Sequence, residues 1–211
     1  MEYKIYSPGG NDTALVLGDD CQDYKAVADE LMARHPNVEQ VGFLSLSKHK
    51  LTMAGGEFCG NASRAACRYY LGGRPGSIEL ETAGQLIKCG IDEDGSTWLE
   101  LPAPSAKQID DGIYLVKLGG ITHIVVTEDG PPAVGMIVAE KLGKAGGRIN
   151  PFVYVRGADT FVNETACLSG TVAAAAIDGV DCAVGQPSGN VVSVEFKKGV
   201  VKVSGYVKEL S

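Results

Sequence analysis

The chain contains two copies of one sequence pattern, and this duplication restricts the folds open to it more than any other feature. A glycine pair followed by an alternating apolar segment occurs at Gly9–Leu17 and returns 110 residues later at Gly119–Thr127. A cysteine, small polar residues and an alanine-rich stretch occur at Cys59–Ala66 and return 108 residues later at Cys167–Ala174. Two features with nearly the same offset indicate a duplicated unit of about 105 residues.

Short apolar segments that end in glycine turns make up most of the chain. Glycine accounts for 28 of 211 residues, roughly twice its usual share, which is typical of tight turns between strands. We expect strands near 2–7, 13–18, 40–46, 50–53, 77–82, 85–91, 96–101, 113–118, 121–127, 151–156, 159–163, 190–196 and 199–206. Helical spacing is found over 21–35, 61–71, 134–144 and 168–177. The pattern predicts an α+β fold with long antiparallel sheets, interrupted near 102–106 by LPAPSA.

Composition argues against several classes of protein. The net charge is −7 and no lysine–arginine cluster is present, so nucleic acid is not an expected partner. No apolar run approaches the roughly 20 residues of a membrane span, and MEYKIYSPGG does not have the layout of a signal peptide. Six cysteines without a CxxC pair, and only three histidines, argue against a metal site. We therefore expect a cytoplasmic protein with reduced thiols and no metal.

The two repeated cysteines each come directly before a helix, and this position indicates chemistry. Unpaired amides and the dipole at a helix N-terminus favour a thiolate and can hold a carboxylate. Two such thiols on opposite sides of a carbon could remove a proton from one face and return one to the other. The other four cysteines lack this setting and are interpreted as structural: Cys21, Cys67, Cys89 and Cys182.

Five short segments add a family resemblance to this interpretation. They are GGND at 9–12, EFCGNASRAA at 57–66, GGITH at 119–123, RINPF at 148–152 and ETACLSGTVAAAA at 164–176. In this order they resemble the diaminopimelate epimerase superfamily, which comprises racemases and epimerases that work without pyridoxal phosphate (PLP) or another cofactor and includes histidine racemases. The CGN-x-x-R block carries most of the specificity.

The resemblance implies two pseudo-symmetric lobes, each a mainly antiparallel sheet wrapped around a central helix. The lobes would span 1–104 and 105–202, with the last strand, about 203–211, free to return to the first lobe. It also implies that Cys59 and Cys167 are the catalytic pair, and that the remaining site residues bind the substrate. Asn11 and Asn150 would hold it, four helix-start residues would cradle its α-carboxylate, His123 would lie near the catalytic centre and Glu164 would orient the site. The four helix-start residues are Gly60, Asn61, Ser169 and Gly170.

The chain also departs from the diaminopimelate enzymes. These carry an arginine just upstream of the Glu-Thr that precedes the second cysteine, whereas this chain has none there and is shorter before Glu164. Leu168 stands where glycine is usual. We therefore expect an amino-acid substrate other than diaminopimelate, such as histidine. Asp159 could pair with its cationic or imidazole side chain, or be a solvated loop charge.

Three alternatives stay open at this point. The chain could be a compact diaminopimelate epimerase in which Arg156 or Lys50 replaces the missing arginine. It could be a proton-shifting isomerase of an unsaturated acid, although such relatives need not keep both cysteines. It could also be a non-enzymatic small-molecule-binding relative. The family often dimerises, which leaves a homodimer open.

Overall fold

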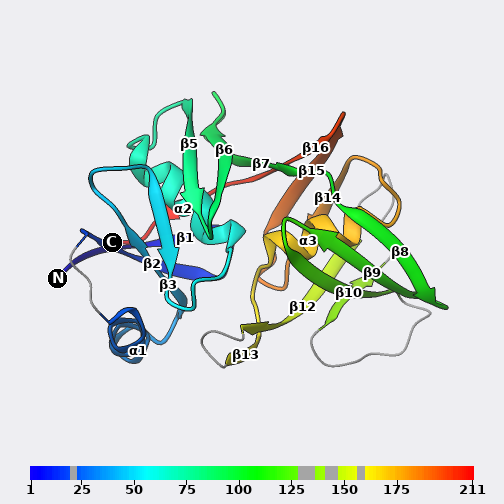
Figure 1. Ribbon diagram of the computed structural model, residues 1–211, viewed down its shortest axis with the longest axis horizontal. Coiled ribbons are helices and arrows are strands. Elements are labelled where there is room, and N and C mark those ends of the chain that lie inside the picture. The colour runs from blue at the N-terminus through cyan, green and yellow to red at the C-terminus, as the bar shows by residue number, and fades with distance from the viewer. Residues whose placement is uncertain (20–22, 128–135, 141–146, 156–159) are drawn as a thin grey trace. The chain divides into compact units, whose positions relative to one another are not determined.

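The structure is a computed structural model that describes residues 1–19, 23–127, 136–140, 147–155 and 160–211 (Figure 1). It is mostly sheet, with three helices among the described residues. The chain divides into two compact units. The first comprises Met1–Leu99, Val155–Thr160 and Gly205–Ser211, and the second comprises Glu100–Tyr154 and Phe161–Ser204. None of the described helices is long and apolar enough to cross a membrane.

The first unit alternates strands with two helices. Its elements are β1 (Glu2–Ser7), β2 (Asp12–Leu17), α1 (Tyr24–Arg34), β3 (Val38–Leu44), β4 (Lys50–Met53), α2 (Gly60–Tyr70), β5 (Gly76–Thr82), β6 (Gln85–Ile91), the start of β7 (Thr97–Pro102) and β17 (Lys208–Glu209). β1 and β2 are antiparallel, β2 and β3 parallel, β3 and β4 antiparallel, β4 and β5 parallel, and β5 and β6 antiparallel. β17 pairs with β1. The parallel pairs are the ones joined through α1 and α2, as expected because parallel neighbours need a long crossover.

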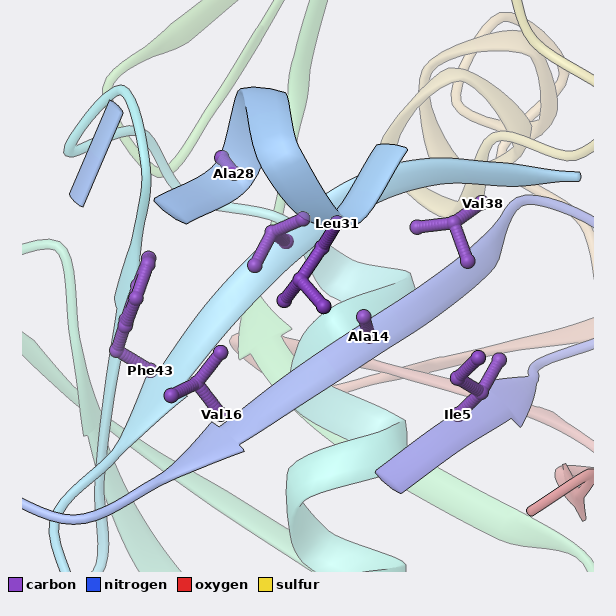
Figure 2. Close-up of a cluster of buried hydrophobic side chains, with 8 residues drawn as sticks. Ile5, Ala14, Val16, Ala28, Leu31, Val38 and Phe43 are labelled. Carbon is purple, nitrogen blue, oxygen red and sulfur yellow. The ribbon is translucent and has the colours of Figure 1, made fainter. Parts of the chain in front are cut away.

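A cluster of buried apolar side chains lies between α1 and the sheet of the first unit (Figure 2). Leu31 and Ala28 come from α1 and pack against apolar side chains of β1, β2 and β3. Asp23 begins the helix by accepting a hydrogen bond from the amide of Ala26 at 3.0 Å. Within the expected stretch 21–35, Tyr24–Arg34 therefore forms a helix because its apolar positions recur on one face and its first turn is capped.

The described residues of the second unit form the end of β7 and ten further elements. They are β8 (Ser105–Asp110), β9 (Ile113–Leu118), β10 (Ile121–Thr127), β11 (Met136–Glu140), β12 (Gly147–Val155), β13 (Thr160–Asn163), α3 (Leu168–Ala175), β14 (Cys182–Gly185), β15 (Val191–Lys197) and β16 (Val200–Gly205). From β9 to β15 the pairing is antiparallel, parallel, antiparallel, parallel and antiparallel. This is the succession found from β1 to β6, so the sequence repeat is matched by a repeated order of strand pairing. The pseudo-symmetric placement of two lobes stays a prediction.

One buried helix packs against the strands of each unit. α2 contacts β2, β3, β4, β5 and β6, and α3 contacts β9, β10, β11 and β15. Residues 60–67 of α2 are all buried, as is most of α3. Alanine and glycine suit these helices because small side chains let a helix approach the surrounding strands closely.

The structure differs from the expectations about the elements in two respects. The helix expected over 134–144 is wrong, because Met136–Glu140 is strand β11, paired with β10 and β12; the rest of that stretch lies outside the described residues. Its β-branched Ile137 and Val138 suit a strand, and the spacing of so short an apolar run does not distinguish the two states. The described strand pairs are mainly antiparallel, as expected, with parallel pairs at β2–β3, β4–β5, β10–β11 and β12–β14. Strands β8, β14 and β17 were not expected. β8 and β17 are polar, and β14 is only a four-residue strand, so their sequences carry little strand signal.

Candidate functional site

Cys59 is the N-cap of α2, and its sulfur is held by two hydrogen bonds. The Sγ accepts from the amide of Ala62 at 3.4 Å, and the thiol donates to Oε1 of Gln40 at 2.9 Å. The backbone around it is also fixed, because the Ser63 hydroxyl donates to the Cys59 carbonyl at 2.7 Å. Cys59 is partly exposed, whereas the first two turns of the helix behind it are buried. The side chain is therefore ordered and still accessible.

Gln40 connects Cys59 to the glycine turn before β2. Its Nε2 donates to the Thr13 hydroxyl at 2.8 Å, and that hydroxyl donates to the Asn11 carbonyl at 3.0 Å. Asn11 is buried and has a φ of 55°, in a turn where Gly9 and Gly10 have φ values of 87° and 102°. Such backbone conformations are tolerated by glycine and asparagine and tend to occur at functional sites.

Asn61, the second residue of α2, is buried, and its Oδ1 accepts from the Arg64 guanidinium at 2.9 Å. The Asn61 side chain therefore binds inside the unit, and its backbone amide lies at the start of the helix. Together with the amide of Gly60 it occupies the N1 and N2 positions, to which a helix itself offers no acceptor.

Cys167 is the N-cap of α3 and repeats the geometry of Cys59. Its Sγ accepts from the amide of Gly170 at 3.4 Å, and its carbonyl accepts from the Thr171 hydroxyl at 2.7 Å. Gly170 and Thr171 are the repeat equivalents of Ala62 and Ser63. The amide of Gly170, expected to cradle a carboxylate, thus contacts the sulfur. Leu168 and Ser169 supply the N1 and N2 amides of this helix.

The surroundings of the Cys167 sulfur differ from those of Cys59. Burial raises the pKa of the Cys167 thiol well above its ordinary value, and the charge and hydrogen bond of Glu164 raise it further. Hydrogen bonds from Gly170 and Ser169 act in the opposite direction. Cys167 is therefore a neutral thiol at neutral pH. Glu164 contacts the cysteine directly, close to the orienting position that was expected for it.

His123 joins the same cluster through Ser169. Its Nε2 lies 3.1 Å from the Ser169 hydroxyl, which lies 3.6 Å from the Cys167 sulfur. His123 is buried in β10, and burial lowers its pKa to about 4. The ring is therefore neutral at pH 7. It can hydrogen-bond Ser169 but carries no charge toward the cysteine.

Gln186 is a residue of this cluster that the sequence reasoning missed. Its Oε1 accepts from the Cys167 amide at 3.0 Å, and its Nε2 donates to Thr171 at 2.9 Å and to the Val184 carbonyl at 3.2 Å. The side chain is fully buried. Gln40 was missed in the same way, since a glutamine in a strand carries no signal of what it contacts.

Asn150 is exposed on β12, and its Oδ1 accepts from Asn163 at 2.8 Å. Asn163 also donates to the carbonyl of Pro151 at 2.8 Å. Asn150 thus forms an amide pair with Asn163, and no described hydrogen bond places its side chain on Cys167. Within the second unit the structure brings His123, Glu164, Ser169 and Gly170 to Cys167. Within the first it brings Gly60, Asn61 and, through Gln40, Asn11 to Cys59.

The other residues considered from the sequence either make structural contacts or lie outside the described residues. Lys50 forms an ion pair with Glu81 at 2.7 Å. Cys67, Cys89 and Cys182 are buried, which fits their interpretation as structural residues. Leu168 is buried in the second unit. Arg156, Asp159 and Cys21 lie outside the described residues. No cluster that could hold a metal ion occurs among the described residues.

Solved structures define the fold class. The chain is similar to a phenazine biosynthesis protein of the PhzF family from Enterococcus faecalis, with a TM-score of 0.70 and 16% identity over 99% of this chain and 96% of that one. A phenazine biosynthesis PhzC/PhzF protein from Clostridium difficile gives a TM-score of 0.68 at 13% identity, with the same coverage of both chains. The fold is thus a PhzF-like α/β fold.

Sequence comparison identifies the family. Residues 1–132 match the family described as the histidine racemase CntK N-terminal domain, and the chain belongs to this family. A histidine racemase of Staphylococcus aureus strain Mu50 is 30% identical over 122 residues, which is 52% of this chain and 44% of that protein. A histidine racemase of Fusobacterium nucleatum is 26% identical over 214 residues, which is 82% of this chain and 79% of that protein. The aligned region spans less than half of the Staphylococcus relative.

Proposed function

We propose that the protein is a cofactor-independent histidine racemase in which Cys59 and Cys167 are the two acid–base groups. The observation that carries the proposal is the repeated cysteine cap. Each thiol begins a buried helix, accepts a hydrogen bond from the amide three residues on, and has its own carbonyl bound by a hydroxyl four residues on. Family membership supports racemisation, and the relatives named as histidine racemases support histidine as the substrate.

The reaction needs one thiolate and one thiol at opposite faces of the α-carbon. The thiolate takes the α-proton and becomes a thiol, leaving a carbanion whose charge spreads into the carboxylate. The opposite thiol then gives its proton to the α-carbon and becomes the thiolate. One proton is taken and one is given, so the enzyme is left with the roles of its two sulfurs exchanged.

The substrate carboxylate would be stabilised by the helix starts. The N1 and N2 amides of α2 and α3 point from the ends of helix dipoles, and negative charge that grows on the carboxylate is favoured there. Ser169, held by neutral His123, is a further hydroxyl donor beside Cys167. The amide pair of Asn150 and Asn163 offers hydrogen bonds for an amino or imidazole group of the substrate.

Deuterium exchange tests the proposal without assuming a product. Reduced protein in heavy water is incubated with a panel of L-amino acids and diaminopimelate, and proton NMR follows each α-proton signal. We expect the histidine signal to fade in the wild-type protein. Cys59→Ser and Cys167→Ser should each reduce exchange by at least about 10³-fold, because serine is a far weaker acid than cysteine. Cys182→Ser, at a buried cysteine away from both caps, is the matched control.

Each outcome of the panel favours one of the functions considered for this protein. Fading of another single amino acid would change the substrate and keep the two-base mechanism. Fading of diaminopimelate alone would favour the compact epimerase, although Lys50 is engaged by Glu81. Full exchange in either cysteine variant would overturn the two-base proposal. No exchange of any compound would redirect the search to unsaturated acids and to binding.

A further inference from the structure

Arg64 is a completely buried cation with no described acidic partner. It lies in α2 and is 0% exposed, and its Nη2 donates to the Pro8 carbonyl at 2.7 Å and to Asn61 at 2.9 Å. Its Nε and Nη1 have no hydrogen-bond partner among the described residues. Burying a charge costs desolvation free energy unless a partner compensates for it. An unpaired buried cation therefore indicates a role beyond packing.

The two acceptors of Arg64 belong to the two backbone segments that form the Cys59 site. Pro8 precedes the Gly9–Gly10–Asn11 turn, and Asn61 follows Cys59 at the start of α2. One guanidinium group therefore fixes the turn and the helix start against each other. Burial lowers the pKa of Arg64 to about 10, and the negative charge that Cys59 carries when ionised raises it. Because such an interaction is mutual, the arginine charge must stabilise the Cys59 thiolate.

The second unit has no equivalent cation. The repeat offset places Val172 opposite Arg64, and Val172 is buried among apolar residues of α3. The glycine turns of the two units also differ in width. Gly119 and Gly120 form a two-residue hairpin loop, with Leu118 paired to Ile121 and φ values of 52° and 85°. The last pair before the first-unit turn is Tyr6 with Thr13, so that loop is wider and presents the Pro8 carbonyl to the arginine.

We propose that Arg64 is a positioning residue that makes Cys59 the thiolate and leaves Cys167 the thiol in the resting protein. Cys59 has a fixed positive charge and a helix start, whereas Cys167 has burial and the negative Glu164. The inference rests on the proposed two-base function for its meaning, but the ionisation itself is measured without substrate. It follows that Cys59 abstracts the first proton in the free enzyme. The resting enzyme therefore reacts with the enantiomer whose α-proton faces Cys59.

Two carboxyl groups near Cys59 act against Arg64, because a negative charge disfavours the Cys59 thiolate. Glu57 lies two residues before the cysteine, and burial raises its pKa. Glu39 is next to Gln40 in β3 and accepts from the Asn11 side chain at 3.4 Å. Gln40 itself accepts from the thiol and so favours the protonated form. Arg64 is the positive group that acts against these three, together with the helix start.

The pH profile of Cys59 alkylation tests this assignment. Reduced protein is treated with iodoacetamide from pH 5 to 10, and mass spectrometry of the Cys59 and Cys167 peptides gives the rate at each thiol. In the wild type we expect the Cys59 midpoint to lie at least about one pH unit below that of Cys167. Arg64→Gln, which keeps hydrogen-bond donors and removes the charge, should raise the Cys59 midpoint by about one pH unit.

Two further variants make the result decisive. Arg68→Gln removes a second arginine one turn along α2 and should leave the Cys59 midpoint within about 0.3 pH units, because that group is partly exposed to solvent screening. Arg64→Lys keeps the charge and should also leave it near the wild-type value. An unchanged midpoint in Arg64→Gln overturns the inference. If that variant does not fold, a full-unit upward shift in Arg64→Lys overturns it, since the charge is retained. Deuterium exchange on histidine is scored separately, so loss of one proposal does not decide the other.

Discussion

The thiol of Cys59 donates to Gln40 at 2.9 Å, and the same glutamine donates to Thr13 at 2.8 Å. The hydrogen bond to Thr13 in β2 therefore fixes the orientation of the Gln40 side-chain amide, so that its oxygen faces the Cys59 sulfur. Whenever Cys59 carries its proton, that proton is thereby aimed along one direction. A candidate catalytic thiol is in this way oriented by a residue from a neighbouring strand.

Gln40→Leu should lower activity with little loss of stability. The variant removes the acceptor that orients the Cys59 thiol in the part of the cycle in which Cys59 is protonated and acts as the acid. A hydrogen bond of this kind contributes about 1 kcal/mol, so we expect roughly a fivefold to tenfold lower rate of histidine α-proton exchange. NMR in heavy water measures the rate, and circular dichroism checks the fold. Gln85→Leu, at a partly exposed glutamine in β6, is the control. Wild-type exchange in Gln40→Leu would remove Gln40 from the site.

Oxidation should join Cys59 to Cys167 if both sulfurs serve one α-carbon. A disulfide needs the two Cα atoms within about 7 Å, and sulfurs on either side of one carbon are close enough to reach this geometry when the substrate is absent. We expect diamide to abolish exchange and dithiothreitol to restore it, with a Cys59–Cys167 linked peptide in the digest. Cys59→Ser provides the control for the linkage. Activity that survives complete thiol oxidation would count against a close pair.

His123 should make stability depend on pH in a defined window. Burial lowers its pKa from 6.5 to about 4, so between these values the unfolded chain binds a proton that the folded chain does not. The contribution is complete above pH 6.5 and is lost as the pH falls toward 4, to an extent of about 2–3 kcal/mol. Urea unfolding at pH 7.0, 5.5 and 4.5 should show a shallower decline for His123→Gln than for the wild type.

The exposed His49 supplies the matched control for this measurement. His49→Gln should decline in parallel with the wild-type protein, because this side chain lies on the surface rather than in the core. Parallel curves for wild type and His123→Gln would show that His123 is protonated as readily in the folded protein as in the unfolded chain. That result would contradict the neutral buried ring described for the Ser169 contact.

Gln186→Ala should be strongly destabilising. The fully buried side chain makes hydrogen bonds with the Cys167 amide, Thr171 and the Val184 carbonyl, and its removal leaves buried polar groups unpaired and a cavity behind. We expect a loss of about 2–4 kcal/mol in the free energy of unfolding. Gln108→Ala, in the exposed strand β8, should change it by less than about 0.5 kcal/mol. Urea denaturation of both variants measures the difference, and equal stabilities would refute the structural role.

The sequence alone predicted the elements that depend on local interactions. The helices at Gly60 and Leu168 begin directly after their cysteines, because small residues, an N-cap and an alanine-rich run act within one or two turns. The glycine pair at 119–120 predicted a tight turn for the same reason, since both positions need a positive φ. The repeat of these local signals also led to the two cysteines and to the family resemblance.

Only the tertiary structure decided which distant side chains meet. Met136–Glu140 is a strand because β10 and β12 offer it partners on both sides, and its own residues do not distinguish strand from helix. Gln40 reaches Cys59, Gln186 reaches the Cys167 amide, and Arg64 reaches Pro8 across 56 residues of chain. A glutamine or arginine in the sequence has the same intrinsic properties whether it is solvated or buried. Its role is set by the pairing of strands and the burial of helices, which arise from the whole chain rather than from neighbours along it.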